Sequence, residues 1–129
     1  MNMNEWTRRR RILSFLKEIK KNSSLLENKD ITPKDSINTE IKLNWLLSLL
    51  KQEKLSDLIL SNLNLKYIDL STVDFTNTRF YKVTLEGCNL SGCNFTNTFF
   101  NECRIYNCEL DGSNYKEASF KKSYMERSL

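Results

Sequence analysis

The sequence predicts a mainly β fold, in which residues 56–129 form a four-sided solenoid and residues 1–55 form an α-helical region. Three observations lead to this prediction. Large apolar residues recur every five residues from Leu60 onward, and their chemical type recurs every twenty residues. The preceding part of the chain has no glycine and places its apolar residues at helical spacing. A period of five fits neither the 3.6-residue repeat of an α-helix nor the two-residue repeat of a simple strand.

The composition excludes several classes of function. The chain has 129 residues, a net charge of +4 and no histidine, so it lacks every Ser-His or Cys-His catalytic arrangement and the commonest metal ligand. No apolar run reaches the roughly 20 residues of a membrane span, and the run after the N-terminal arginines is shorter than the roughly 7–15 residues of a secretory signal. We therefore expect a cytoplasmic protein that uses no cofactor.

Two helices are predicted in residues 1–55. The first covers about Glu5 to Lys21 and places Ile12, Phe15, Leu16 and Ile19 on one side. Residues 22–31 are expected to form a linker. The second helix starts at Pro33, with Thr32 as its N-cap, and runs to about Lys54. Its predicted apolar face consists of Ile37, Ile41, Trp45, Leu46, Leu49 and Leu50.

The helical region has two possible roles. A stacked solenoid exposes an apolar end that invites aggregation unless something covers it. We therefore expect the second helix to cap the first coil. The alternative is that the helical pair is a docking or oligomerisation element.

From Leu58 to Arg127 the chain divides into fourteen blocks of five residues. The first residue of each block is Leu, Ile, Val, Thr, Cys, Ser or Ala, and the third is always large and apolar or aromatic. Each block therefore supplies one smaller and one larger inward side chain. The predicted solenoid core consists of Leu65, Leu70, Phe75, Phe80, Leu85, Leu90, Phe95, Phe100, Ile105, Leu110, Tyr115 and Phe120.

The fifth residues predict turns. Half of them are Gly or Asn, including all three glycines, Gly87, Gly92 and Gly112. These residue types accept the positive φ that the third residue of a type II turn requires. The third residues also sort into four columns when every fourth block is compared: two columns are aliphatic and two are mainly aromatic. Residues twenty apart should therefore lie above one another in successive coils.

The blocks Cys88-Asn89-Leu90-Ser91-Gly92 and Cys93-Asn94-Phe95-Thr96-Asn97 resemble the A-(D/N)-L-x-x motif of the pentapeptide-repeat family. The resemblance implies a right-handed quadrilateral β-helix with four blocks per coil. Fourteen blocks then give about 3.5 coils, or roughly 17 Å at the spacing of neighbouring strands. In the family, Asp or Asn at the second position serves the turn backbone. Cys, Thr, Val and Ser mostly replace the family's usual first-position Ala here.

The four cysteines have the spacing C-x4-C-x9-C-x4-C. Zinc sites normally use closer pairs on loops that let four sulfurs converge. Because Cys88, Cys93, Cys103 and Cys108 all occupy the first position of a block, we predict that they pack as small apolar residues and hold no metal. Cys88 and Cys108 should stack, which leaves a disulfide as the alternative.

A run of cations lies near the N-terminus, beside Trp6 and Phe15. It is either a solvated helix face or a binding site for an anionic partner, such as an acidic protein, nucleic acid or a membrane surface. Arginines in the first turns of a helix oppose its dipole, which favours a functional reason for them. The candidate residues are Arg8, Arg9, Arg10, Arg11, Lys17, Lys20 and Lys21.

The predicted function is a non-enzymatic protein–protein interaction module. Family resemblance supplies one alternative, because quinolone-resistance members mimic B-DNA and bind type II topoisomerases. A repeat region of roughly 17 Å with net charge −1 fits that role poorly. The second alternative is the basic N-terminal helix bound to nucleic acid or an anionic membrane. We also expect self-association or partner binding through the last coil, at Tyr124, Met125 and Leu129.

Overall fold

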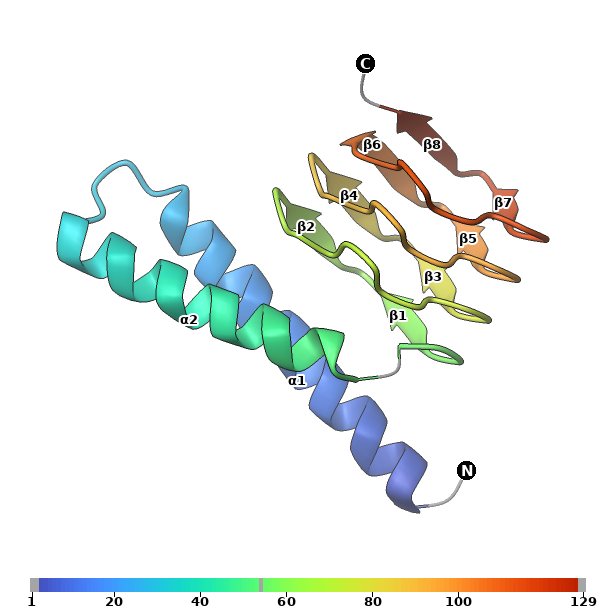
Figure 1. Ribbon diagram of the computed structural model, residues 1–129, viewed down its shortest axis with the longest axis horizontal. Helices are drawn as coiled ribbons and strands as arrows, with labels where there is room; N and C mark the ends of the chain where they lie inside the picture. Colours follow the sequence, from blue (N-terminus) through green and yellow to red (C-terminus); the bar gives the residue numbers. More distant parts are fainter. Residues whose placement is uncertain (1–2, 54, 128–129) are drawn as a thin grey trace. The chain divides into compact units, whose positions relative to one another are not determined.

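The computed structural model describes residues 3–53 and 55–127, and these form two compact units (Figure 1). Residues 3–53 form a helical unit of two helices, α1 (Met3–Leu26) and α2 (Pro33–Lys51). Residues 55–127 form a repeat unit of eight short strands in two parallel sheets.

The start of α2 is the predicted one. Pro33 is the first helical residue, and the Asp35 amide donates a 3.1 Å hydrogen bond to Oγ1 of the N-cap Thr32. The end of α1 differs from the prediction, because the helix continues to Leu26 and shortens the linker. The Asn22 side chain, expected in the linker, is buried and donates to the Glu18 carbonyl one turn earlier. Asn22 therefore lies inside the helix, with its side chain bonded to the preceding turn instead of capping the helix end.

The apolar face predicted for α2 is partly wrong. Leu46 and Leu50 are buried as predicted, together with Leu43 and Leu47, which the prediction left out. Ile37, Ile41 and Trp45 are instead exposed. Since α2 carries large apolar residues on two opposite sides, spacing alone did not identify the buried side. The core of the helical unit contains the buried leucines of α2 and the α1 residues Ile12, Leu16 and Ile19.

The strands form two walls of the solenoid. One sheet has the order β1 (Ile59–Ser61), β3 (Arg79–Tyr81), β5 (Phe99–Asn101) and β7 (Ser119–Lys121). The other has the order β2 (Asn64–Lys66), β4 (Thr84–Glu86), β6 (Arg104–Cys108) and β8 (Tyr124–Arg127). The central residues Leu60, Phe80, Phe100 and Phe120 pair in successive strands, which confirms the twenty-residue period.

The other two walls are joined by isolated parallel bridges. Asp69, Asn89 and Glu109 form one series, and Asp74, Asn94 and Asn114 form the other. The chain therefore turns at four corners in each coil, which confirms the predicted four-sided β-solenoid.

Large side chains fill the solenoid in columns. Phe80, Phe100 and Phe120 stack with ring centroids 5.0 and 4.7 Å apart, and Phe75, Phe95 and Tyr115 stack at 5.3 and 5.5 Å. Offset-stacked rings at these separations stabilise the core beyond the area that they bury. The buried members of the predicted core are Leu65, Leu70, Phe75, Phe80, Leu85, Leu90, Phe95, Phe100 and Ile105.

Three residues predicted in the core are less buried than expected. Phe120 is 41% exposed, and Leu110 and Tyr115 are half-buried. All three lie in the last coil that the structure describes. A side chain there packs on a neighbour in one adjacent coil only, as Phe120 does on Phe100. The inward pattern therefore fixes the direction of a side chain but not its burial.

The turns recur as predicted. Every fifth residue from Asp57 to Lys122 has a positive φ, including the β-branched Thr72 at +64°. The second-position Asp or Asn stabilises several corners by accepting the backbone N–H two residues later, as Asp74 does from Thr76 at 2.9 Å. At Gly87 a Cβ would lie 2.5 Å from Cε1 of Tyr67 in the preceding coil, so any other residue there would have to displace that exposed ring.

Candidate interaction surfaces

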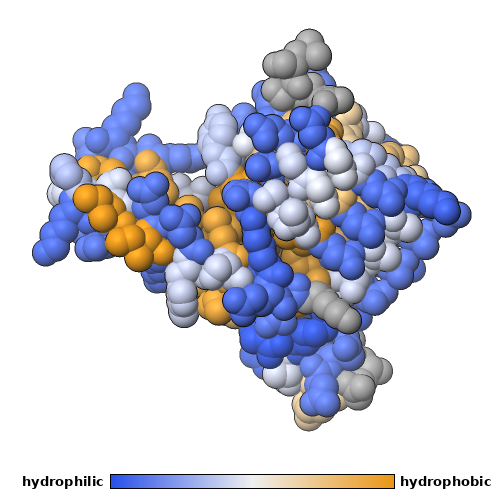
Figure 2. Space-filling model, in the orientation of Figure 1, coloured by the Kyte–Doolittle hydropathy of each residue, from blue (hydrophilic) through white to orange (hydrophobic). Residues whose placement is uncertain are grey.

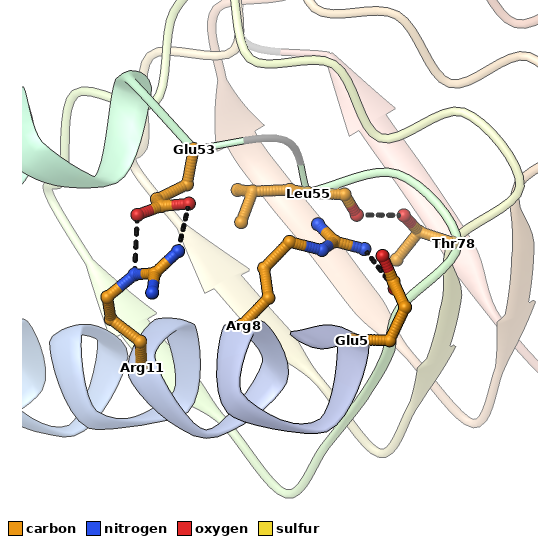
Figure 3. A network of polar contacts seen from close by, with 6 residues as sticks. All are labelled: Glu5, Arg8, Arg11, Glu53, Leu55 and Thr78. Carbon is orange, nitrogen blue, oxygen red and sulfur yellow. Dashed lines mark hydrogen bonds and ion pairs between the residues drawn. The ribbon is translucent and has the colours of Figure 1, made fainter. Parts of the chain in front are cut away.

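The first-position Thr and Cys side chains bond one coil to the next. The buried hydroxyl of Thr78 donates to the Leu55 carbonyl at 2.6 Å (Figure 3), and that of Thr98 donates to the Phe75 carbonyl at 2.7 Å. The Cys93 thiol donates in the same way to the Leu70 carbonyl at 3.0 Å. In each case the acceptor lies 23 residues earlier in the chain. The sequence analysis predicted that the first-position residues act only as smaller inward side chains, so it did not foresee these hydrogen bonds.

The cysteines are enclosed in the repeat unit. All four are buried free thiols. The neighbouring Cys108 thiol and burial raise the pKa of Cys88, and burial raises the pKa of Cys103. The hydrogen bond with Cys88 lowers the pKa of Cys108, but this thiol is fully buried. The raised pKa keeps the Cys88 and Cys103 thiols protonated at neutral pH, and burial shields all four from reagents. Within residues 3–53 and 55–127, no three Cys, Asp or Glu side chains are placed to hold a metal ion.

The predicted anionic-partner residues do not form one surface. Arg8 pairs with Glu5 at 3.2 Å, and Arg11 donates to both carboxylate oxygens of Glu53 at 2.7 and 3.0 Å (Figure 3). The Arg11 pair joins α1 to the residues that follow α2, so it has a structural role. The hydrogen bonds from Arg11 lower the pKa of Glu53. Arg9 is half-buried.

The remaining candidates lie on the outer side of α1. Arg10, Lys17, Lys20 and Lys21 are all exposed. The Arg10 guanidinium lies 4.6 Å from the centre of the Trp6 ring, a cation–π contact. These four cations are exposed members of the predicted basic patch; Arg11 is exposed as well, but it is bonded to Glu53.

Helix α2 carries an exposed apolar stripe, made of residues that the prediction placed on its apolar face. Ile37, Ile41 and Trp45 are 58%, 63% and 57% exposed and follow one another at steps of four residues. Side chains spaced in this way lie on one face of a helix. Figure 2 shows apolar side chains gathered over α2. We call these three residues the α2 stripe.

The outer faces of the repeat unit carry charges that are partly paired. Lys66 and Glu86 lie 3.8 Å apart in neighbouring coils, and Lys82 and Glu102 lie 3.9 Å apart. A shallow hollow of about 470 Å³ opens on the first sheet, lined by Asn77, Arg79, Asn97 and Phe99. Partly compensated charges of this kind are typical of a solvated surface.

The predicted C-terminal association residues differ in their environments. Tyr124 is exposed, and its hydroxyl accepts a 2.7 Å hydrogen bond from Nε of Arg104. Met125 is half-buried, and Leu129 lies outside the described residues. Association through this coil stays a prediction.

Comparison with known families identifies the repeats. Two family models, both described as pentapeptide repeats, match residues 55–92 and 75–123, and together they cover more than half of the sequence. The chain belongs to the pentapeptide-repeat family. No curated protein matches it.

This pentapeptide-repeat protein is also similar to a solved structure, the pentapeptide repeat protein Rfr23 from the cyanobacterium Cyanothece 51142. The two are 21% identical with a TM-score of 0.43, and the match covers 54% of this chain and 62% of Rfr23. Among the described residues of the pentapeptide-repeat protein, neither helix combines the length and apolar character that a membrane span needs.

Proposed function

We propose that the protein is a non-enzymatic protein–protein interaction module, and that the α2 stripe contacts the partner. The observation that carries this proposal is the exposure of Ile37, Ile41 and Trp45 on the side of α2 opposite its buried leucines. A tryptophan that follows two isoleucines on one helix face has the composition of an interface anchor, since Trp is enriched among residues that dominate binding energy.

The spacing of the stripe defines the kind of partner. Side chains one helical turn apart suit an apolar groove, as in complexes in which an amphipathic helix inserts its anchors into such a groove. Full burial of one large apolar side chain contributes about 1.5–3 kcal/mol. More than half of each stripe residue remains available for burial, so the three together offer on the order of 4 kcal/mol. We therefore expect a folded protein partner with an apolar groove.

The repeat unit supports this proposal as a scaffold. Its coils are linked by backbone ladders and by the buried Thr and Cys hydrogen bonds, and its core is packed with stacked rings. The topoisomerase-binding alternative receives less support. A mimic of B-DNA needs uncompensated carboxylates, whereas Glu86 and Glu102 are each paired with a lysine of a neighbouring coil.

A matched pair of variants tests the proposal. Ile41→Glu introduces a charge into the α2 stripe, and Ile59→Glu introduces the same charge on β1 at a position of similar exposure, 58%. Affinity capture from the source cells should recover a protein with the native chain and with Ile59→Glu but not with Ile41→Glu. A Trp6→Phe background leaves Trp45 as the only tryptophan, and its emission should shift to the blue when the captured protein is added.

Two results would contradict the proposal. One is that every captured protein is retained by Ile41→Glu. The other is a Trp45 emission that stays unchanged when the captured protein is bound. If light scattering instead shows a native dimer that Ile41→Glu makes monomeric, the stripe pairs two copies and the proposal of a groove-bearing partner is wrong.

A further inference from the structure

The outer side of α1 carries a second exposed surface, separate from the α2 stripe. We call this surface the cationic face of α1; it consists of Met3, Trp6, Arg10, Leu13, Lys17, Lys20, Lys21 and Ser24. Apart from Lys21, which lies beside Lys20, these residues follow one another at alternating steps of three and four, so they share one face of the helix. All eight are exposed.

The cationic face has charge of one sign. Arg10, Lys17, Lys20 and Lys21 lie on it, and none of its residues is acidic. The two carboxylates of α1 are elsewhere, where Glu5 pairs with Arg8 at 3.2 Å and Glu18 pairs with Lys42 at 3.6 Å. From Arg10 to Lys21 the helix rises about 16 Å. Four cations within that length complement an extended anionic surface.

Apolar side chains lie among these cations. Trp6 is 48% exposed, and Leu13 and Met3 are exposed on the same face. A tryptophan ring favours the boundary between water and an apolar phase, and the long stems of Lys and Arg cover apolar surface while their charged ends stay in water. The highly charged sugar–phosphate backbone of a duplex offers little apolar surface to Leu13 or Met3. The combination therefore favours a lipid surface over nucleic acid.

We propose that the cationic face of α1 binds the surface of an anionic phospholipid membrane. The helix lies parallel to the membrane plane, with Trp6 and Leu13 at the headgroup level and the four cations against lipid phosphates and carboxylates. This inference does not depend on the proposed function, because it uses a different helix and a different class of partner.

Vesicle flotation of the full chain tests the proposal. We expect binding to vesicles of phosphatidylcholine with 30% phosphatidylserine, little binding to pure phosphatidylcholine, and release from the anionic vesicles at high salt. The variant Arg10→Gln/Lys17→Gln/Lys20→Gln should weaken binding to the anionic vesicles about a hundredfold, the equivalent of about 3 kcal/mol. Because these side chains are exposed, far-UV dichroism should show native helix content.

A control variant removes the same charge elsewhere. Lys116→Gln/Lys121→Gln/Lys122→Gln changes three exposed lysines of the repeat unit and should leave binding within a few-fold of native. A second measurement follows insertion of the ring: in a Trp45→Phe background, Trp6 emission should shift to the blue on anionic vesicles.

The proposal fails under any of four outcomes. These are no binding of the native chain to anionic vesicles, an equal loss in the control variant, an unchanged Trp6 emission in the bound state, and tighter binding to duplex DNA than to vesicles at equal phosphate concentration and salt.

Discussion

Phe100 and Phe120 occupy the same aromatic column but have different numbers of neighbours, so their truncation to alanine tests how the solenoid is stabilised. Phe100 is fully buried, with stacked rings on both sides at 5.0 and 4.7 Å and Phe95 at 5.8 Å. Phe120 is 41% exposed and stacks on Phe100 alone among the residues described here. β7 pairs with β5 on one side, and no described strand pairs with its other side.

The expected cost follows from these environments. Truncation of a buried Phe to Ala typically costs about 3–5 kcal/mol, because transfer free energy is lost and a cavity remains. Phe100→Ala should fall in that range. Phe120→Ala should cost about half as much, since the side chain buries little more than half of its surface and leaves no enclosed cavity. For a domain of this size, the difference of about 2 kcal/mol corresponds to roughly 8–16 °C in melting temperature.

The chain allows the two units to be followed separately. Both tryptophans, Trp6 and Trp45, lie in the helical unit, and all five tyrosines lie in the repeat unit. Tyrosine absorbance in a urea titration therefore reports the repeat unit, while tryptophan fluorescence reports the helices. If Phe100→Ala prevents folding, the milder Phe100→Leu still provides the comparison with Phe120→Leu. Equal destabilisation at positions 100 and 120 would show that stacking between coils does not govern stability.

The other predictions concern a turn, a salt bridge, the thiols and the last coil. Thr72→Asn should stabilise the repeat unit by about 1 kcal/mol, because Asn tolerates a φ of +64° better than a β-branched residue. The melting temperature of the repeat unit should rise by about 4–8 °C, and an unchanged melting temperature would refute the prediction. Arg11 lowers the pKa of Glu53 in the folded state. The stability that this pair contributes is therefore complete above the ordinary carboxyl pKa of about 4.3, and it is lost as the pH falls through the lowered pKa of Glu53. Tryptophan-monitored stability should thus decrease more on acidification in the native chain than in Glu53→Gln, and parallel pH profiles would contradict the role of the pair. A thiol reagent at pH 8 should modify no cysteine of the native chain and all four in urea, since Cys88, Cys93, Cys103 and Cys108 are buried. Rapid modification of the cysteines in the native chain would show that the core of the repeat unit opens and exposes them. If the last coil associates, light scattering should show a complex that Tyr124→Ala/Met125→Ala dissociates, whereas a native monomer would remove that prediction.

Much of the fold followed from sequence because the repeat is redundant. Each coil must have the cross-section of its neighbours, so Phe75, Phe95 and Tyr115 had to share a column, and the structure stacks them. The turns were also readable, because Gly87, Gly92 and Gly112 mark positions where φ is positive. The capping of the first coil by residues 33–51 stays a prediction.

The candidate surfaces were harder to predict. The seven basic residues near the N-terminus all lie between positions 8 and 21, yet Arg8 and Arg11 bind Glu5 and Glu53. Glu53 is 42 residues from Arg11 in the chain, and no local pattern reveals such a pair. Likewise, the sequence contains two apolar sides on α2, and only the packing of the helical unit shows which one is exposed.

The sequence by itself determined the period, the four columns and the inward direction of each large side chain, since these depend on local turns repeated every five residues. The tertiary structure alone decided which inward residues are fully buried, which cations are neutralised and which face of α2 meets solvent. The physical reason is that local backbone geometry sets where a side chain points, whereas burial and charge pairing depend on residues far away in the chain.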